Sequence, residues 1–229
     1  MHSKRYQLNN AHKDQTGYIL CSGPSLPVKN EELKEFLSCQ LLIGTNLAYK
    51  YIEPTYLVVR DKFIWQHFYG EISQLQKTTV FTWEYTIPDN KKIPDNTITL
   101  LRKAQTFLLP DGLHNTVPIY NNAGLSALGI CYALGLKNIY ILGADLGQQD
   151  GKNNWHFDYT LIDPYKSTPS AFYDECFEVF KNVIREMQKR DISIINCSPV
   201  SRLRDIIPYM EYEELYNKEI QNAFSERIG

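Results

Sequence analysis

The chain has 229 residues, a formal net charge of -2 and a hydrophobic content of 43%. This length suffices for an α/β domain whose core needs no cross-links. The charge argues against a broad nucleic-acid-binding face, and no nucleic acid is expected as a partner. No apolar stretch is long enough for a transmembrane segment, and the polar N-terminus has no signal-peptide core behind it, so we expect a cytoplasmic protein.

The cysteine pattern agrees with a reducing compartment. The number of cysteines is odd, no two cysteines have the C-x-x-C spacing of metal or redox motifs, and most of them lie in apolar runs. We therefore expect reduced core residues and no metal site at Cys21, Cys39, Cys131, Cys176 and Cys197.

In the first half of the chain, short apolar runs bounded by turn residues predict strands. Between several of these strands, apolar residues recur at helical spacing and predict helices. We expect strands at 18–21, 41–44, 56–59, 79–82 and 97–100, and helices at 31–37, 45–51 and 63–68. Residues 102–120 show no period and are expected to form a surface loop.

The second half begins with a helix at 122–134, which Gly135 ends in a left-handed C-cap. A strand at 139–142 follows and leads to Asp145. Residues 147–170 form a long polar and aromatic insertion, which is typical of a lid. An amphipathic helix at 170–190 and a strand at 192–195 complete the pattern. Alternating strands and helices predict one Rossmann-like α/β domain over 1–229, with a mostly parallel sheet, helices on both faces and the lid insertion.

Ligands of such sheets bind beyond the carboxyl ends of the strands. Five separate segments place polar or small residues there, and neither a G-x-G-x-x-G fingerprint nor a P-loop is present. The candidate binding residues of these segments are Ser22, Gly23, Ser25, Asn46, Asp61, Asn122, Gly124 and Asp145.

Four short motifs carry a family resemblance: Ser-Gly-Pro-Ser-Leu at 22–26, Gly-Thr-Asn at 44–46, Asn-Ala-Gly-Leu at 122–125 and Ile-Leu-Gly-Ala-Asp at 141–145. The pattern over residues 17–200 resembles Rossmann-like bacterial glycosyltransferases. These are the motility-associated-factor (flagellin glycosyltransferase) domain and the bacterial lipooligosaccharide sialyltransferases. The archaeal 6-hydroxymethyl-dihydropterin pyrophosphokinase is similar in fold and motif.

The resemblance implies a nucleotide-activated sugar as donor, for example a CMP-linked one as in the sialyltransferases. It places Ser22, Gly23 and Ser25 near the nucleotide phosphates and Asn46 against nucleotide or phosphate. Asn122, Ala123 and Gly124 would approach the base or ribose, and Asp145 would lie beneath the pocket. The acceptor would be a hydroxyl of a glycan, a glycolipid or a protein glycan.

One departure concerns the catalytic base. The sialyltransferases carry a histidine shortly before the late amphipathic helix, and no histidine stands at 165–170 here. His156, in the predicted lid, is the substitute that can take the acceptor proton near neutral pH, and Asp158 is a second candidate. The alternative is that His156 only packs or hydrogen-bonds in the lid. Tyr159, Tyr165 and Lys152 are candidates to stabilise the leaving phosphate.

Three functions follow. The first is glycosyl transfer from a nucleotide sugar, which requires no metal or other cofactor. The second is Mg²⁺-dependent diphosphate transfer from ATP to a pterin-like alcohol, with ion ligands drawn from Asp145, Asp150, His156 and Asp158. The third is a nucleotide-sugar-binding module without turnover. The oligomeric state stays open.

Overall fold

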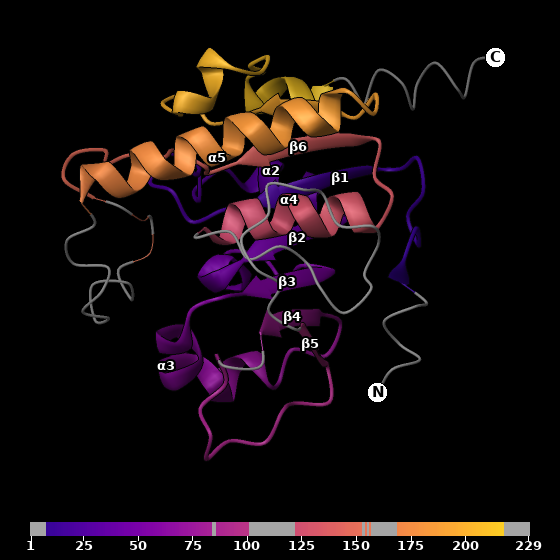
Figure 1. Ribbon diagram of the computed structural model, residues 1–229, viewed down its shortest axis with the longest axis vertical. Helices are drawn as coiled ribbons and strands as arrows, with labels where there is room; N and C mark the ends of the chain where they lie inside the picture. The colour runs from indigo at the N-terminus through magenta and orange to yellow at the C-terminus, as the bar shows by residue number, and fades with distance from the viewer. Residues whose placement is uncertain are drawn as a thin grey trace.

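The computed structural model describes residues 8–83, 86–100, 122–152, 154, 156 and 169–217. Seven strands in this part of the chain form a single sheet in the order β5-β4-β3-β2-β1-β6-β7 (Figure 1). They are β1 (Thr16–Leu20), β2 (Leu42–Thr45), β3 (Tyr56–Val59), β4 (Thr79–Trp83), β5 (Thr97–Leu100), β6 (Asn138–Leu142) and β7 (Ser193–Asn196). Every pairing is parallel, which confirms the predicted α/β, Rossmann-like class.

Both faces of the sheet are covered. Neighbouring residues of one strand point to opposite faces, so Ile19 and Leu20 are both fully buried but belong to different core clusters. The helices α2 (Glu31–Ser38) and α3 (Lys62–Ile72), with the 3-10 helix η1 (Asn46–Lys50), bury their apolar residues on the Leu20 face. The helices α4 (Ala123–Ala133) and α5 (Ser170–Gln188) cover the Ile19 face.

Helix α4 lies in the centre of its layer (Figure 1). It packs on β1, β2 and β3 and also contacts α5, and nearly all of its residues are buried. A helix that is apolar all round is expected in such a position. Five of its residues are small, which lets neighbouring elements approach it closely: Ala123, Gly124, Ser126, Ala127 and Gly129.

The strand order creates a switch point between β1 and β6. After β1 the chain passes to α2 on one face, and after β6 it passes to α5 on the other. Connections that leave neighbouring strands in opposite directions open a crevice at the carboxyl edge of a sheet. The site described below lies at this edge.

Most predicted elements agree with the structure within two residues. The predicted helix at 45–51 is instead the short 3-10 helix η1. Part of the predicted lid is regular, because Gln149 and Lys152 exchange two backbone hydrogen bonds around Asp150 and Gly151, both with positive φ. This is the geometry of a two-residue hairpin turn. Residues 153, 155 and 157–168 of the lid and the predicted loop at 102–120 lie outside the described residues. A second 3-10 helix, η4 (Arg202–Asp205), follows β7.

A polar cavity at the carboxyl edge of the sheet

A cavity of about 280 Å³ opens where β1, β2, β3 and β6 end. Its volume is close to the lower end of the range for small-molecule sites, roughly 300–1,000 Å³. Eight of the predicted binding residues line it: Ser22, Gly23, Asn46, Asp61, Asn122, Ala123, Gly124 and Asp145. The convergence that the strand ends predict is therefore present.

The loops that follow β1 and β6 are tied to each other. Gly23 N–H donates to the Gly143 carbonyl at 2.7 Å. The Asp145 carboxylate accepts the Ser25 backbone N–H at 2.8 Å and also the Ser25 hydroxyl. A Cβ on Gly23 would lie 2.4 Å from the Gly143 carbonyl oxygen and 2.7 Å from the Asp145 carboxyl carbon. The glycine is required because the two loops approach so closely.

Ser25 differs from its predicted role. Its hydroxyl and its backbone N–H are both bound to Asp145, and it is not among the residues that line the cavity. Here it fixes the loop and the carboxylate; contact with a phosphate stays a prediction. Ser22 does line the cavity, and its hydroxyl donates to the Thr45 carbonyl at 3.4 Å.

Asn46 and Asp61 form a pair at the ends of β2 and β3. The Asn46 side-chain amide donates to Asp61 Oδ2 at 2.9 Å. Asn46 has a φ of 49°, in the left-handed region that few residues other than glycine and asparagine adopt. Strained backbone of this kind clusters at ligand sites, and it is held here by the side-chain contact with Asp61.

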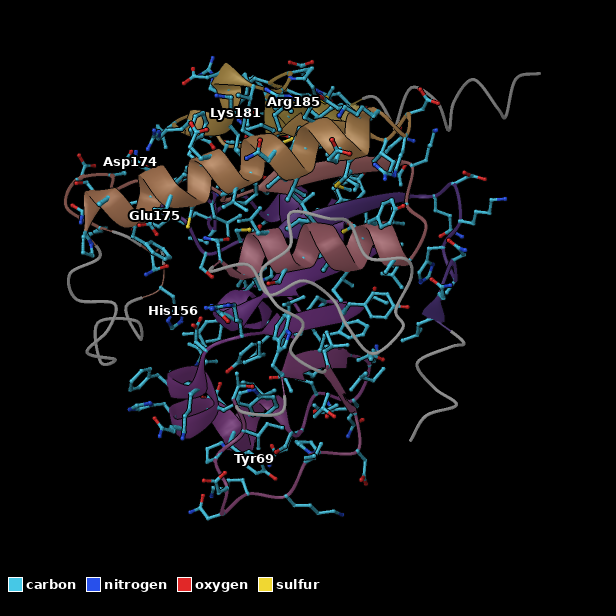
Figure 2. The ribbon with its side chains drawn as sticks, viewed as in Figure 1. Tyr69, His156, Asp174, Glu175, Lys181 and Arg185 are labelled. Carbon is cyan, nitrogen blue, oxygen red and sulfur yellow. The ribbon has the colours of Figure 1, made fainter. Side chains whose placement is uncertain are left out.

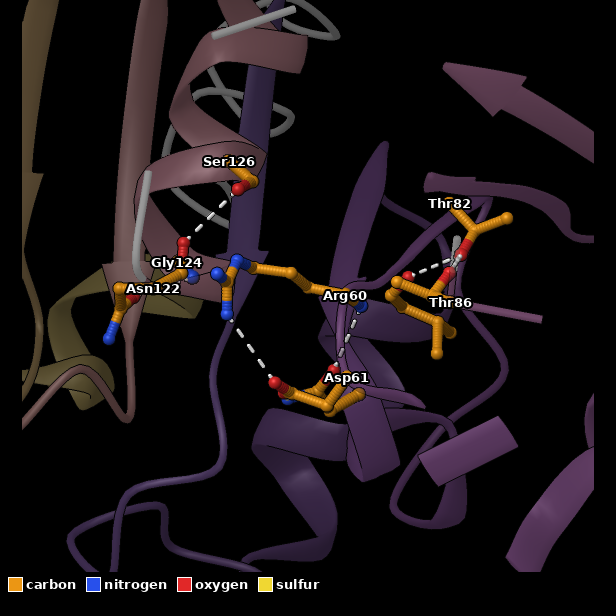
Figure 3. Close-up of polar contacts among 9 residues, drawn as sticks. Arg60, Asp61, Thr82, Thr86, Asn122, Gly124 and Ser126 are labelled. Carbon is orange, nitrogen blue, oxygen red and sulfur yellow. Dashed lines mark hydrogen bonds and ion pairs between the residues drawn. The ribbon is translucent and has the colours of Figure 1, made fainter. Parts of the chain in front are cut away.

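The N-terminus of α4 is capped by its own side chain. Asn122 Oδ1 accepts the N–H of Gly124 at 2.8 Å and of Leu125 at 3.3 Å. Figure 3 shows Asn122, Gly124 and Ser126 at this end of the helix. The Gly124 N–H, which the family resemblance places near the nucleotide, is thus already engaged by the cap.

Arg60 and three aromatic side chains also line the cavity, although the sequence pattern did not predict them. Arg60 follows β3 and lines the cavity, and Phe172, Tyr173 and Phe180 reach the cavity from α5. The position of Arg60 beside Asp61 at a strand end was the available signal. For the aromatic residues no signal was available, because the amphipathic pattern of α5 does not distinguish core residues from residues that line a cavity.

The electrostatics of the cavity follow from burial. Burial raises the pKa of Asp145, although the hydrogen bonds from Ser25 oppose the shift. Burial also raises the pKa of the Cys21 thiol to about 12, so Cys21 lines the cavity as a neutral group. All five cysteines are free.

His156, the predicted base, is half-buried. Figure 2 shows it on the side of the molecule where α5 begins, below that helix in the view. It is not among the lining residues of the cavity, whereas Asn154, two positions earlier, is. The other predicted lid residues, Asp158, Tyr159 and Tyr165, lie outside the described residues.

The second predicted function needs oxygen ligands for Mg²⁺. In the part of the chain that the structure describes, no three histidine, cysteine or acidic side chains gather in a way that could hold a metal ion. The cavity's two carboxylates are both engaged, Asp145 by Ser25 and Asp61 by Asn46. Asp158, one of the predicted ligands, lies outside the described residues, so the Mg²⁺ site stays a prediction. None of the described helices combines the length and apolar content that crossing a membrane requires.

Fold and cavity together define a doubly wound α/β protein with a polar cavity at its switch point. No family model matches the chain, and no curated protein matches it in sequence. Among solved structures it is similar to the MAf glycosyltransferase from Magnetospirillum magneticum AMB-1, with a TM-score of 0.57 and 14% identity over 88% of this chain. The match covers 34% of that longer protein.

It is also similar to the sialyltransferase CstII from Campylobacter jejuni in complex with cytidine-5'-monophosphate. The TM-score is 0.54 and the identity 16%, over 87% of this chain and 86% of that one. At these identities the likeness concerns the fold, and at that level the predicted resemblance to both groups of glycosyltransferases is confirmed. The relation to the pyrophosphokinase stays a prediction.

Proposed function

We propose that this protein is a glycosyltransferase that moves a sugar from a nucleotide-activated donor to an acceptor hydroxyl. The observation that carries the proposal is the cavity at the carboxyl edge of the sheet, lined by the polar ends of β1, β2, β3 and β6 and by the start of α4. Nucleotides bind at this edge in doubly wound folds. The fold itself is shared with glycosyltransferases, one of them bound to CMP.

In the proposed mechanism the donor nucleotide occupies the cavity and the segment 147–170 closes over it. His156, or alternatively Asp158, takes the proton of the acceptor hydroxyl as its oxygen bonds to the sugar. The bond between sugar and phosphate breaks, and the electron pair leaves with the nucleotide. Lys152, Tyr159 and Tyr165 would stabilise the negative charge on the departing phosphate. Closure that excludes water would suppress hydrolysis of the donor.

A ligand screen tests the proposal. Thermal unfolding is measured with CMP, CDP, UDP, GDP, ADP and ATP, each with and without Mg²⁺. A ligand present at about 100 times its dissociation constant adds roughly 2.7 kcal/mol to the stability of the native state. Stabilisation by CMP or a nucleoside diphosphate without metal is expected, followed by slow hydrolysis of the matching nucleotide sugar.

Each alternative gives a different result. Stabilisation by ATP or ADP only in the presence of Mg²⁺ would favour diphosphate transfer to a pterin-like alcohol. Binding of a nucleotide sugar with neither hydrolysis nor transfer would favour a binding module. A protein that none of these nucleotides stabilises would contradict the proposal.

A further inference from the structure

Arg60 supplies the one lysine or arginine side chain among the described residues that line the cavity. It follows β3 directly, and its side chain is 20% exposed. Figure 3 shows the guanidinium extending from the end of β3 toward the N-terminus of α4, beside Gly124. The guanidinium also acts on the Cys176 thiol of α5, whose pKa burial raises to about 11 and Arg60 partly lowers. Arg60 thus shares the cavity wall with residues of α4 and α5.

The hydrogen-bonding capacity of this guanidinium is largely unused. A guanidinium carries five N–H donors. Arg60 Nε is buried and has no partner among the described residues. The ion pair with its neighbour Asp61 joins Nη1 to Oδ1 at 3.4 Å, longer than the roughly 2.7–2.9 Å of strong charge-assisted hydrogen bonds. The other oxygen of Asp61 is bound to Asn46.

The rest of the cavity wall does not compensate this charge strongly. Asp145, the second acid, has both carboxyl oxygens bound to Ser25, and burial raises its pKa. The N-terminus of α4, which carries partial positive charge, faces the same space. Its N–H groups at Gly124 and Leu125 are taken by the Asn122 cap, so Arg60 provides the free donors for an anion.

We propose that Arg60 binds the phosphate of the donor nucleotide. Two oxygens of a phosphate fit the planar fork of a guanidinium and can accept from its buried, unpartnered Nε. This inference rests on the proposed function and adds the residue that distinguishes a nucleotide from its nucleoside. It assigns phosphate binding to the end of β3, whereas the sequence motifs place it on the loop after β1.

The experiment compares nucleotides with their nucleosides. Isothermal titration calorimetry measures CMP against cytidine, UDP against uridine and GDP against guanosine, with pyrophosphate as a probe of the phosphate alone. The variants are Arg60→Gln, which removes the charge, and Arg60→Lys, which keeps the charge but loses the fork. Arg185→Gln is the matched control, because Arg185 is exposed near the opposite end of α5 (Figure 2).

We expect Arg60→Gln to weaken nucleotide binding about tenfold or more while nucleoside binding stays unchanged, since a charged hydrogen bond is lost. Arg60→Lys should lose part of the affinity, and Arg185→Gln none. Equal weakening of nucleotide and nucleoside, or no weakening, overturns the assignment. If Arg60→Gln does not fold, as circular dichroism would show, Arg60→Lys decides by the same comparison.

The two proposals fail in different ways. If the wild-type protein and the Arg60 variants bind a nucleotide with the same affinity, the inference is wrong and the proposed function stands. If the protein binds pyrophosphate, loses that binding in Arg60→Gln and binds none of the nucleotides, Arg60 forms an anion site. The proposed glycosyltransferase function is then wrong. Binding of neither pyrophosphate nor any nucleotide overturns both.

Discussion

The Asp145 carboxylate holds Ser25, 120 residues earlier in the chain, through two hydrogen bonds. The contact joins the loop after β1 to the loop after β6, the two strands that flank the switch point. It gives both residues a structural role at the site in addition to any contact with a ligand. The depth and shape of the cavity therefore depend on how closely these loops approach.

The approach of the two loops predicts the effect of Gly23→Ala. The added Cβ would collide with the Gly143 carbonyl and the Asp145 carboxyl, so we expect a loss of about 1–3 kcal/mol in the free energy of unfolding. Gly70→Ala is the matched control, because a Cβ at this helical position meets nothing within 4 Å. It should stabilise the protein by up to about 1 kcal/mol. Urea unfolding measures both, and equal stabilities of the two variants would contradict the close contact.

The pH dependence of stability should contain a contribution from Asp145. Its pKa is raised in the native state, so the native protein keeps this proton when the unfolded chain, with a pKa near 3.8, has lost it. The free energy of unfolding therefore falls as the pH rises through that value, and levels off above the native pKa. Below about pH 3.8 both states hold the proton and the effect is absent.

Asp145→Asn removes this titration and keeps groups that can bind Ser25. We expect its stability relative to wild type to increase as the pH rises from about 3.8, and then to become constant. Urea unfolding at a series of pH values, followed by tryptophan fluorescence, measures the difference. A difference that does not change with pH would show that the carboxyl titrates equally in the folded and unfolded protein.

The cap of α4 can be separated from its role in the cavity. Asn122→Ala leaves two N–H groups without the side-chain acceptor, and should cost about 1 kcal/mol in the free energy of unfolding. Asn122→Asp keeps an acceptor and should preserve stability. Its carboxylate would stand in the cavity that Arg60 also lines, so we expect it to weaken nucleotide binding. Chemical unfolding and calorimetry give the two readouts; stable Asn122→Asp protein with wild-type affinity would argue against an anion at this end of the cavity.

The sequence was sufficient to predict the edge of the sheet where the cavity lies. Carboxyl ends of parallel strands share one edge, so Ser22, Asn46, Asp61 and Asp145 could be grouped from the strand pattern alone. What each side chain contacts could not be predicted in this way. The bonds of Asp145 to Ser25 and of Asn46 to Asp61 depend on how far each loop projects beyond its strand.

Arg60 shows the same limit more clearly. An arginine after a strand is usually a solvated surface residue, since its long side chain can reach water from most positions. Here the side chain is only 20% exposed and lines a cavity to which α4 and α5 also contribute residues. That outcome is set by the packing of helices more than 60 residues further along the chain, which no local pattern contains.

Replacement of His156 tests the proposed base. His156→Ala should lower the rate of sugar transfer by about 10²- to 10⁴-fold, the usual contribution of a general base, with little change in the affinity for the donor. His67→Ala is the control, because His67 is exposed on α3 and its Nδ1 contacts only the Phe63 carbonyl of its own helix in the contacts described. Single-turnover kinetics separate the two effects, since binding and transfer are measured independently. Normal transfer by His156→Ala would remove this histidine as the base and move the assignment to Asp158.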